Sequence, residues 1–208
     1  MSRSSARGRY WGPVVILLLL FVVAGLVGGP ENMRDVAAIH SLAAERGVDQ
    51  GLTRQAIIIT RFGGASALLA MLLIALAILA HGRRWRAMTA LAGIVIGGRI
   101  AVELLKLAID RPRPHFSPYP VEIASLSFPS GHSANSMITF LALALIAAPA
   151  RYRSASIAAA VAASVLIGST RPLLGVHWPS DVVGGWAFGI LWVLIGAHLS
   201  RGWRSAAK

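Results

Sequence analysis

The stretch ASALLAMLLIALAILA, from Ala65 to Ala80, is apolar apart from one serine and carries no charge. It approaches the length of roughly 20 residues that a helix needs to span a bilayer. A second stretch, from Val14 to Val27, has the same character. Of the 208 residues, 56% are hydrophobic and 13% are charged, and the apolar residues form long stretches rather than an amphipathic pattern. The sequence therefore predicts an all-α, polytopic membrane helical bundle that forms one domain over residues 1–208.

Each predicted span is bounded by charge, proline or glycine. About six transmembrane helices are expected, at residues 13–29, 56–80, 87–108, 133–149, 155–171 and 181–199. Basic residues cluster at every second junction, namely Arg3, Arg7 and Arg9, then Arg83, Arg84 and Arg86, then Arg151 and Arg153, then Arg201, Arg204 and Lys208. Because basic loops stay in the cytoplasm, both termini are predicted to be cytoplasmic and the connections 30–55, 109–132 and 172–180 to lie outside. The first stretch lacks an A-x-A cleavage site and is interpreted as a retained anchor.

The charge and composition exclude several classes of protein. The net charge is +12, but the basic residues form short clusters rather than one stripe with interleaved aromatics, so we expect no nucleic-acid partner. The chain has no cysteine, which excludes disulfides and thiolate metal sites. The outside segment 31–54 is expected to include a surface helix, since Val36, Ile39 and Ala43 have helical spacing. A spacer helix packed on the bundle is favoured over a substrate lid.

The third predicted span ends in the run Lys106-Leu-Ala-Ile-Asp-Arg-Pro-Arg-Pro114. Pro112 and Pro114 should end the helix and turn the chain, which lets Arg113 fold back toward Lys106. Taken alone, these two cations would be explained as side chains that reach the headgroup layer from a helix end.

The run Phe128-Pro129-Ser130-Gly131-His132 directly precedes the fourth predicted span. Ser130 and Gly131 would then present free backbone amides at a helix N-terminus, where anions bind well. In isolation, Ser130 would be interpreted only as a helix cap and His132 as a surface histidine.

The run Thr170-Arg171-Pro-Leu-Leu-Gly-Val-His177-Trp-Pro-Ser-Asp181 ends where the sixth predicted span begins. A nucleophilic histidine needs a carboxylate that accepts the proton of one ring nitrogen while the other nitrogen attacks an electrophile. His177 and Asp181, four residues apart, suit these two roles. The simpler explanation of the same pair is that Asp181 caps the span and His177 lies at the interface.

The three runs decide the question together, because all are predicted to lie on the same outer face beside the ends of spans. They supply three cations, two histidines and one carboxylate. Several cations and helix-start amides suit the oxygens of a phosphoryl group in transfer, where positioning and charge stabilisation provide most of the catalysis. The sequence therefore predicts a phosphate site.

The order and spacing Lys106-x6-Arg113-Pro114, Pro129-Ser130-Gly131-His132 and Arg171-x5-His177-x3-Asp181 resemble the three signature motifs of the type 2 phosphatidic acid phosphatase superfamily. The resemblance covers residues 106–181 directly. It implies a nucleophile, an orienting carboxylate and a general acid, which would be His177, Asp181 and His132 respectively. It also implies a set of groups that bind the substrate phosphate, namely Lys106, Arg113, Ser130, Gly131 and Arg171. The family usually has serine before the third-motif arginine, where this chain has Thr170, which retains a hydroxyl.

The resemblance implies a bacterial inner-membrane lipid phosphatase whose active site faces the periplasm or exterior. Its expected substrate is a lipid phosphate monoester or diphosphate, of the polyprenyl diphosphate, phosphatidic acid or phosphatidylglycerophosphate type, hydrolysed through a phosphohistidine. No cofactor is expected, and no metal, because the histidines and carboxylate lack the spacing of metal ligands. A phosphotransferase with the same site is an alternative. A non-enzymatic phosphate-binding transporter is disfavoured because its polar groups should lie near the membrane midplane. The sequence does not indicate the oligomeric state.

Arg99, Glu103 and Lys106 lie at i, i+4 and i+7 on the third predicted span. We expect Glu103 to pair with Arg99, because an unpaired arginine at the centre of the apolar layer costs about 2.5 to 3.5 kcal/mol on insertion scales.

Overall fold

A computed structural model describes residues 3–115, 119–121 and 125–205, so Lys208 of the last basic cluster lies outside the described residues. No strand occurs within these ranges, which confirms the all-α prediction. The helices are α1 (Arg3–Val27), α2 (Met33–Val48), α3 (Gln50–Arg61), α4 (Ala65–His81), α5 (Trp85–Ile109), α6 (Gly131–Ala142), η1 (Leu143–Ala147), η2 (Ala150–Tyr152), α7 (Arg153–Leu173) and α8 (Pro179–Ser205).

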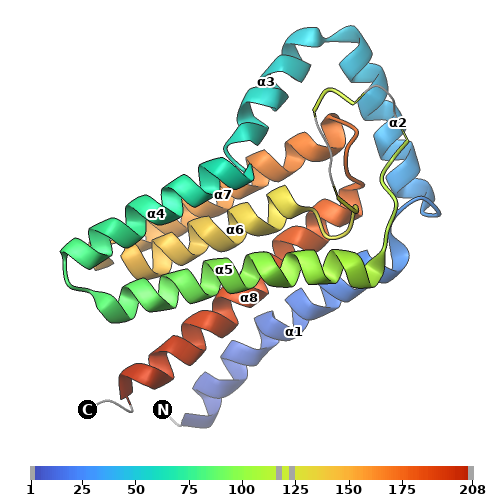
Figure 1. The fold of residues 1–208 in the computed structure, drawn as a ribbon. Coiled ribbons are helices and arrows are strands. Elements are labelled where there is room, and N and C mark those ends of the chain that lie inside the picture. The colour runs from blue at the N-terminus through green and yellow to red at the C-terminus, as the bar shows by residue number, and fades with distance from the viewer. Residues whose placement is uncertain (1–2, 116–118, 122–124, 206–208) are drawn as a thin grey trace.

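The long helices form a bundle, and α2 and α3 arch over one end of it (Figure 1). Helix α6 is central, because it packs against α5, α7 and α8, while α1 packs along α8 and α4 along α5. The loop that follows α5 rises beside α2 before it returns to the start of α6 (Figure 1). Both chain termini lie at the end of the bundle away from α2.

Four helical segments are long and apolar enough to cross a membrane, and each overlaps a predicted span. They are Gln50–His81, Trp85–Ile109, Ala150–Leu173 and Pro179–Ser200. Shorter apolar helices, Trp11–Val27 and Gly131–Ala147, lie at the two remaining predicted spans. Large apolar side chains on the outside of the bundle are well exposed, for example Ile78 at 66% and Leu107 at 72%. The chain is a multi-pass membrane protein.

The predicted span 56–80 is wrong at its start, because the structure divides it between two helices. Helix α3 ends at Arg61 and α4 begins at Ala65, and α3 leaves the direction of α4 (Figure 1). The break has a packing reason at Gly63. A side-chain Cβ there would lie 2.4 Å from Cγ2 of Ile167 and 3.2 Å from Cδ2 of His132. Only a glycine lets this turn approach both α7 and α6.

Helices α6 and α8 approach each other closely at two glycines of α8. A Cβ at Gly185 would lie 2.9 Å from the carbonyl oxygen of Ser130, and one at Gly189 would lie 3.0 Å from that of Ala134. Small residues at such spacing allow helix backbones to pack tightly in membranes. This contact fixes the first turn of α6 beside the first turn of α8, where the second and third sequence motifs meet.

Candidate active site

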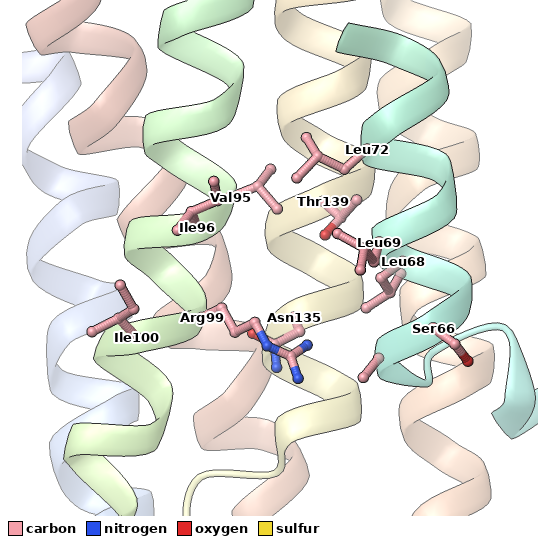
Figure 2. A pocket seen from close by; sticks show the side chains of 11 residues that line it. Ser66, Leu68, Leu69, Leu72, Val95, Ile96, Arg99, Ile100, Asn135 and Thr139 are labelled. Atoms are coloured by element: carbon pink, nitrogen blue, oxygen red, sulfur yellow. The ribbon is translucent and has the colours of Figure 1, made fainter. Parts of the chain in front are cut away.

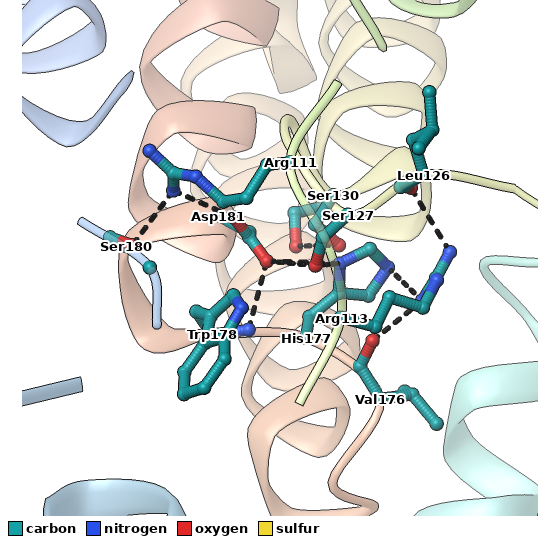
Figure 3. Close-up of polar contacts among 12 residues, drawn as sticks. Arg111, Arg113, Leu126, Ser127, Ser130, Val176, His177, Trp178, Ser180 and Asp181 are labelled. Carbon is teal, nitrogen blue, oxygen red and sulfur yellow. Dashed lines mark hydrogen bonds and ion pairs between the residues drawn. The ribbon is translucent and has the colours of Figure 1, made fainter. Parts of the chain in front are cut away.

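The carboxylate of Asp181, in the first turn of α8, is fully buried and contacts four groups (Figure 3). Its Oδ1 accepts a hydrogen bond of 2.9 Å from Nη1 of Arg111. Its Oδ2 accepts from the hydroxyl of Ser127 and from the backbone N–H of Trp178 at 2.9 Å. The same Oδ2 lies 3.4 Å from Nδ1 of His177. The carboxylate is therefore held rigidly beside the imidazole.

The imidazole of His177, in the loop between α7 and α8, is only 1% exposed. Its Nε2 lies 3.0 Å from Nη1 of Arg113. A guanidinium can only donate, so Nε2 must accept, and the ring proton belongs on Nδ1, toward Asp181. Burial, and next the neighbouring Arg113, lower the pKa of His177 well below its ordinary value of 6.5. The ring is therefore neutral at pH 7, with an unprotonated Nε2 whose lone pair accepts from Arg113.

Three cations line the same cavity as His177. The ammonium of Lys106 donates to the hydroxyl of Ser125 at 2.7 Å, and Arg113 donates to the carbonyl oxygens of Ser125 and Val176, each at 2.6 Å. Arg171, which is 3% exposed, donates from Nη1 to the hydroxyl of Thr60 at 2.7 Å. The backbone and hydroxyl partners fix each cation without neutralising it.

The structure brings most of the predicted site residues to one cavity of about 270 Å³. Its lining includes Lys106, Arg113, Gly131, His132, Arg171 and His177. Asp181 lies behind His177 and does not line the cavity. Ser130 does not line it either, because its hydroxyl is buried and accepts from Ser133 Oγ at 3.1 Å while its N–H donates to the carbonyl of Asp181. The binding of phosphate by Ser130 stays a prediction.

Arg111 is a buried residue of the site that the sequence did not reveal. Besides Asp181, it donates to the hydroxyl of Ser180 at 3.1 Å and to the carbonyls of Ala24 and Gly25 in α1. Its guanidinium also lies 4.5 Å from the ring centroid of Phe128. The sequence did contain a signal, because Arg111 and Arg113 stand on either side of one proline and therefore leave the end of the helix in different directions. Nothing in the sequence, however, assigned a role to Arg111.

Ser127 was also missed. Its hydroxyl donates to Oδ2 of Asp181 and lies 3.4 Å from Nδ1 of His177 (Figure 3). It therefore joins the second and third motifs through one hydrogen-bond network. Its position three residues before Ser130 carries no pattern by which sequence alone could single it out.

Helix α2 is tied to the start of α8 by Asp35, which is 6% exposed. The Oδ1 of Asp35 accepts from the backbone N–H of Ser180 at 3.1 Å, and Oδ2 accepts from the Ser180 hydroxyl and from the N–H of Gly29. At its other end, α2 contacts α7 through Arg46, which donates to the carbonyl of Leu173. These contacts agree with the predicted helix that packs on the bundle.

Two further expectations concern charge and metal. Arg99 and Glu103 form no ion pair or hydrogen bond within the described ranges, so the predicted pair is wrong. The i, i+4 spacing places both residues on one face of α5, but Arg99 also borders a second, apolar cavity. Among the described histidines, aspartates and glutamates, no group of three is arranged to bind a metal ion.

The fold and this cavity define a polytopic helical membrane protein with a cationic, histidine-containing site at one end of its bundle. Comparison with known proteins identifies the family. The model of the PAP2 superfamily matches residues 86–205, which include every residue of the three motifs. The chain belongs to the PAP2 superfamily.

Individual relatives cover different shares of the chain. A lipid A 1-phosphatase from Rhizobium johnstonii is 42% identical over 113 residues, which span 50% of this chain and 43% of that protein. Phosphatidylglycerophosphatase B from Bacillus subtilis is 30% identical over 174 residues, 74% of this chain and 84% of that protein. The crystal structure of a transmembrane PAP2 type phosphatidylglycerolphosphate phosphatase from Bacillus subtilis superposes with a TM-score of 0.80 at 27% identity, covering 94% of this chain and 97% of that one.

Proposed function

We propose that this protein is an integral membrane lipid phosphatase that works through a covalent phosphohistidine at His177. The observation that carries the proposal is the position of Nε2 of His177. It faces a cavity lined by Lys106, Arg113 and Arg171, while Nδ1 faces the buried carboxylate of Asp181. Family membership and relatives named as phosphatases of lipid phosphates support the same activity.

In the first step, the substrate phosphate enters the cavity and its oxygens bind the three cations and the amides at the start of α6. Arg113 exchanges its contact with Nε2 for a phosphate oxygen, which frees the lone pair. Nε2 then attacks phosphorus in line with the ester oxygen, a P–N bond forms and the P–O bond to the lipid breaks. Asp181 stabilises the positive charge that develops on the ring.

His132, in the first turn of α6, protonates the leaving oxygen of the lipid. In the second step it takes a proton from water, the water oxygen attacks phosphorus, and the P–N bond breaks. The products are inorganic phosphate and a dephosphorylated lipid, and His177 returns to its neutral form. The cavity lining supports this role, because it contains both His132 and His177.

The site is proposed to face the periplasm or exterior of a bacterial inner membrane, with six crossings and both termini cytoplasmic. Helices α4 and α5 meet at the bundle end opposite α2, and Arg84 in their turn donates to the carbonyl of Ile146 at 2.9 Å. The turn between α4 and α5, which contains Arg83 and Arg84, and the two termini lie at the end of the bundle away from α2 (Figure 1). Cytoplasmic loops are enriched in basic residues, which supports an external position for the opposite end.

The test is release of inorganic phosphate by purified protein in detergent from phosphatidic acid, phosphatidylglycerophosphate and polyprenyl diphosphate. We expect wild type to release phosphate from at least one of them. His177→Ala should lose about 1000-fold or more of that rate. His81→Ala, an exposed histidine at the far end of α4, is the matched control and should retain the wild-type rate.

The covalent step needs its own measurement. Lipid carrying radioactive phosphate should label wild-type protein in an acid-labile, base-stable form, as a phosphohistidine requires, and should not label His177→Ala. Activity without any such label would remove the covalent mechanism. Transfer of the label to an added alcohol in preference to water would instead favour the phosphotransferase, and phosphate binding without release from any lipid would favour the transporter.

A further inference from the structure

A second cavity, of about 280 Å³, adjoins the candidate active site between α4, α5 and α6 (Figure 2). Its walls are mainly apolar and include Leu68, Leu69, Leu72, Val95 and Ile96. Three residues line both cavities, namely Ala65, Arg99 and Asn135. The apolar walls of the second cavity suit a hydrocarbon chain. The three shared residues would therefore lie at the junction between the polar head and the tail of a bound lipid.

Arg99 occupies an unusual depth. It lies ten residues before the last residue of α5, which corresponds to about 15 Å along the helix. Because α5 is long and apolar enough to cross a membrane, Arg99 is expected to lie within the apolar layer, which is about 30 Å thick, rather than at its edge. Figure 2 shows its guanidinium directed away from α5, across the gap toward α4, with Asn135 beside it. A charged residue at this depth with no partner in the described chain indicates a functional site.

Asn135 is the second polar group at the junction. Its Oδ1 is buried and has no hydrogen-bond partner within the described residues. Its Nδ2 would lie 3.8 Å from a Cβ placed on Gly131, and Nζ of Lys106 would lie 3.6 Å from the same point. Asn135 therefore extends from the phosphate-binding end of the first cavity to the apolar entrance of the second. Its Nδ2 H atoms can donate to an anion, whereas the unpartnered Oδ1 can only accept and does not itself bind one.

The charge of the first cavity exceeds what one phosphate needs. Its lining contains four cations, Arg99, Lys106, Arg113 and Arg171, and one carboxylate, Glu103. The other nearby carboxylate, Asp181, is paired with Arg111 and does not line the cavity. A phosphate monoester carries a charge of about −1.5 to −2 at pH 7. The remaining positive charge suits a second anionic group next to the first.

We propose that Arg99 and Asn135 bind a second phosphate of the substrate, located between the phosphoryl group transferred to His177 and the hydrocarbon chain. The inference rests on the proposed function and narrows its substrate class. Lipid diphosphates and lipids with a phosphodiester next to a terminal phosphate have such a group, and phosphatidic acid has none. In a diphosphate the second phosphate belongs to the leaving group, so the guanidinium of Arg99 also stabilises the charge that develops there when the P–O bond breaks.

The test compares kcat/KM for polyprenyl diphosphate, phosphatidylglycerophosphate and phosphatidic acid in matched detergent micelles. Arg99→Gln should lower kcat/KM about 10- to 100-fold for a substrate with a second phosphate, as expected for the loss of a charged hydrogen bond, and less than about 3-fold for phosphatidic acid. Arg99→Lys should restore part of the loss, and Asn135→Leu should show the same selectivity. The control is Arg86→Gln, an exposed arginine at the opposite end of α5.

The two substrates with a second phosphate also show which kind of group the site binds. A loss of kcat/KM on polyprenyl diphosphate alone would assign the site to a diphosphate, and a loss on phosphatidylglycerophosphate alone would assign it to a phosphodiester. An equal loss of kcat/KM on all three lipids, or no loss on any, would overturn the inference but would not contradict the proposed phosphatase function. A binding measurement separates the two proposals further. In the His177→Ala background, polyprenyl diphosphate should bind more tightly than the monophosphate, and Arg99→Gln should abolish that difference. An unchanged difference would overturn the inference even if no lipid were hydrolysed.

Discussion

Arg111 and Asp181 are joined by a 2.9 Å ion pair whose side chains are 5% and 0% exposed. Arg111 also bonds to the backbone of α1, so the pair links three parts of the chain: α1, the loop after α5 and the start of α8. In the proposed mechanism this contact positions His177, because the other oxygen of the same carboxylate faces the ring.

Removing Arg111 should destabilise the protein and reduce its activity. Loss of one partner of a buried ion pair leaves an uncompensated charge, which costs about 3 to 5 kcal/mol. Arg111→Met should therefore lower the thermal unfolding midpoint in detergent and slow phosphate release. Arg54→Met, at an exposed position of α3, should change neither. An Arg111→Met protein as stable and active as wild type would contradict the positioning role of the pair.

The low pKa of His177 predicts how the rate depends on pH. In the proposed mechanism the attacking form is the neutral ring, and burial followed by the charge of Arg113 lowers the pKa of His177. We expect kcat/KM to be unaffected by protonation of His177 at pH 6.5, where an ordinary histidine would be half protonated, and to fall only as pH decreases further. The substrate phosphate also titrates near pH 6. Measuring kcat/KM against pH for two lipids whose phosphates differ in pKa would distinguish His177 from the substrate phosphate. The part of the curve that is due to the enzyme should stay at the same pH for both lipids. A fixed limb at or above pH 6.5 would disagree with this expectation.

Adding one methyl group at the contact of α6 with α8 should disturb the site. The Cβ of Gly185→Ala would lie 2.9 Å from the backbone oxygen of Ser130, which cannot rotate away. Overpacking of this kind costs about 1 to 3 kcal/mol. We expect a lower unfolding midpoint and slower phosphate release. Gly93→Ala, in α5, has no atom within 4 Å of its new Cβ and should be tolerated, so equal effects of the two substitutions would argue against the close contact.

Phosphate release should not depend on a divalent metal. The charge that develops on the phosphoryl group faces Lys106, Arg113 and Arg171, which provide the stabilisation that a metal ion supplies in other phosphatases. Assays with and without an excess of chelator should give the same rate. Complete loss on chelation with recovery on addition of a metal would refute the proposed mechanism.

The sequence predicted the parts of the fold that depend on composition. Long apolar stretches predicted all-α structure and the positions of the long helices, and most of the site residues predicted from the three motifs line one cavity. Motif spacing could do this because each motif lies at a helix end, and the packing of α5, α6, α7 and α8 brings those ends together.

The remaining features depend on contacts between distant segments. The apolar residues Ile57 and Ile58 lie close before α4, so one span was predicted across Arg61, Gly63 and Gly64. The chain breaks there because Gly63 approaches Ile167 of α7. Arg111 has the same local pattern as Arg113, and only its contacts with α1 and Asp181 distinguish it. Helical spacing predicted that Arg99 would pair with Glu103, but it could not show the two cavities that meet at Arg99.

Hydrogen bonds between Asp35 and Ser180 connect helix α2 to the carboxylate of Asp181, because Ser180 also accepts from Arg111, the partner of Asp181. A ligand that displaced α2 is therefore expected to shift the first turn of α8 without entering the cavity. Helix α2 is thus a position from which the arrangement of Asp181 and His177 could be altered at a distance.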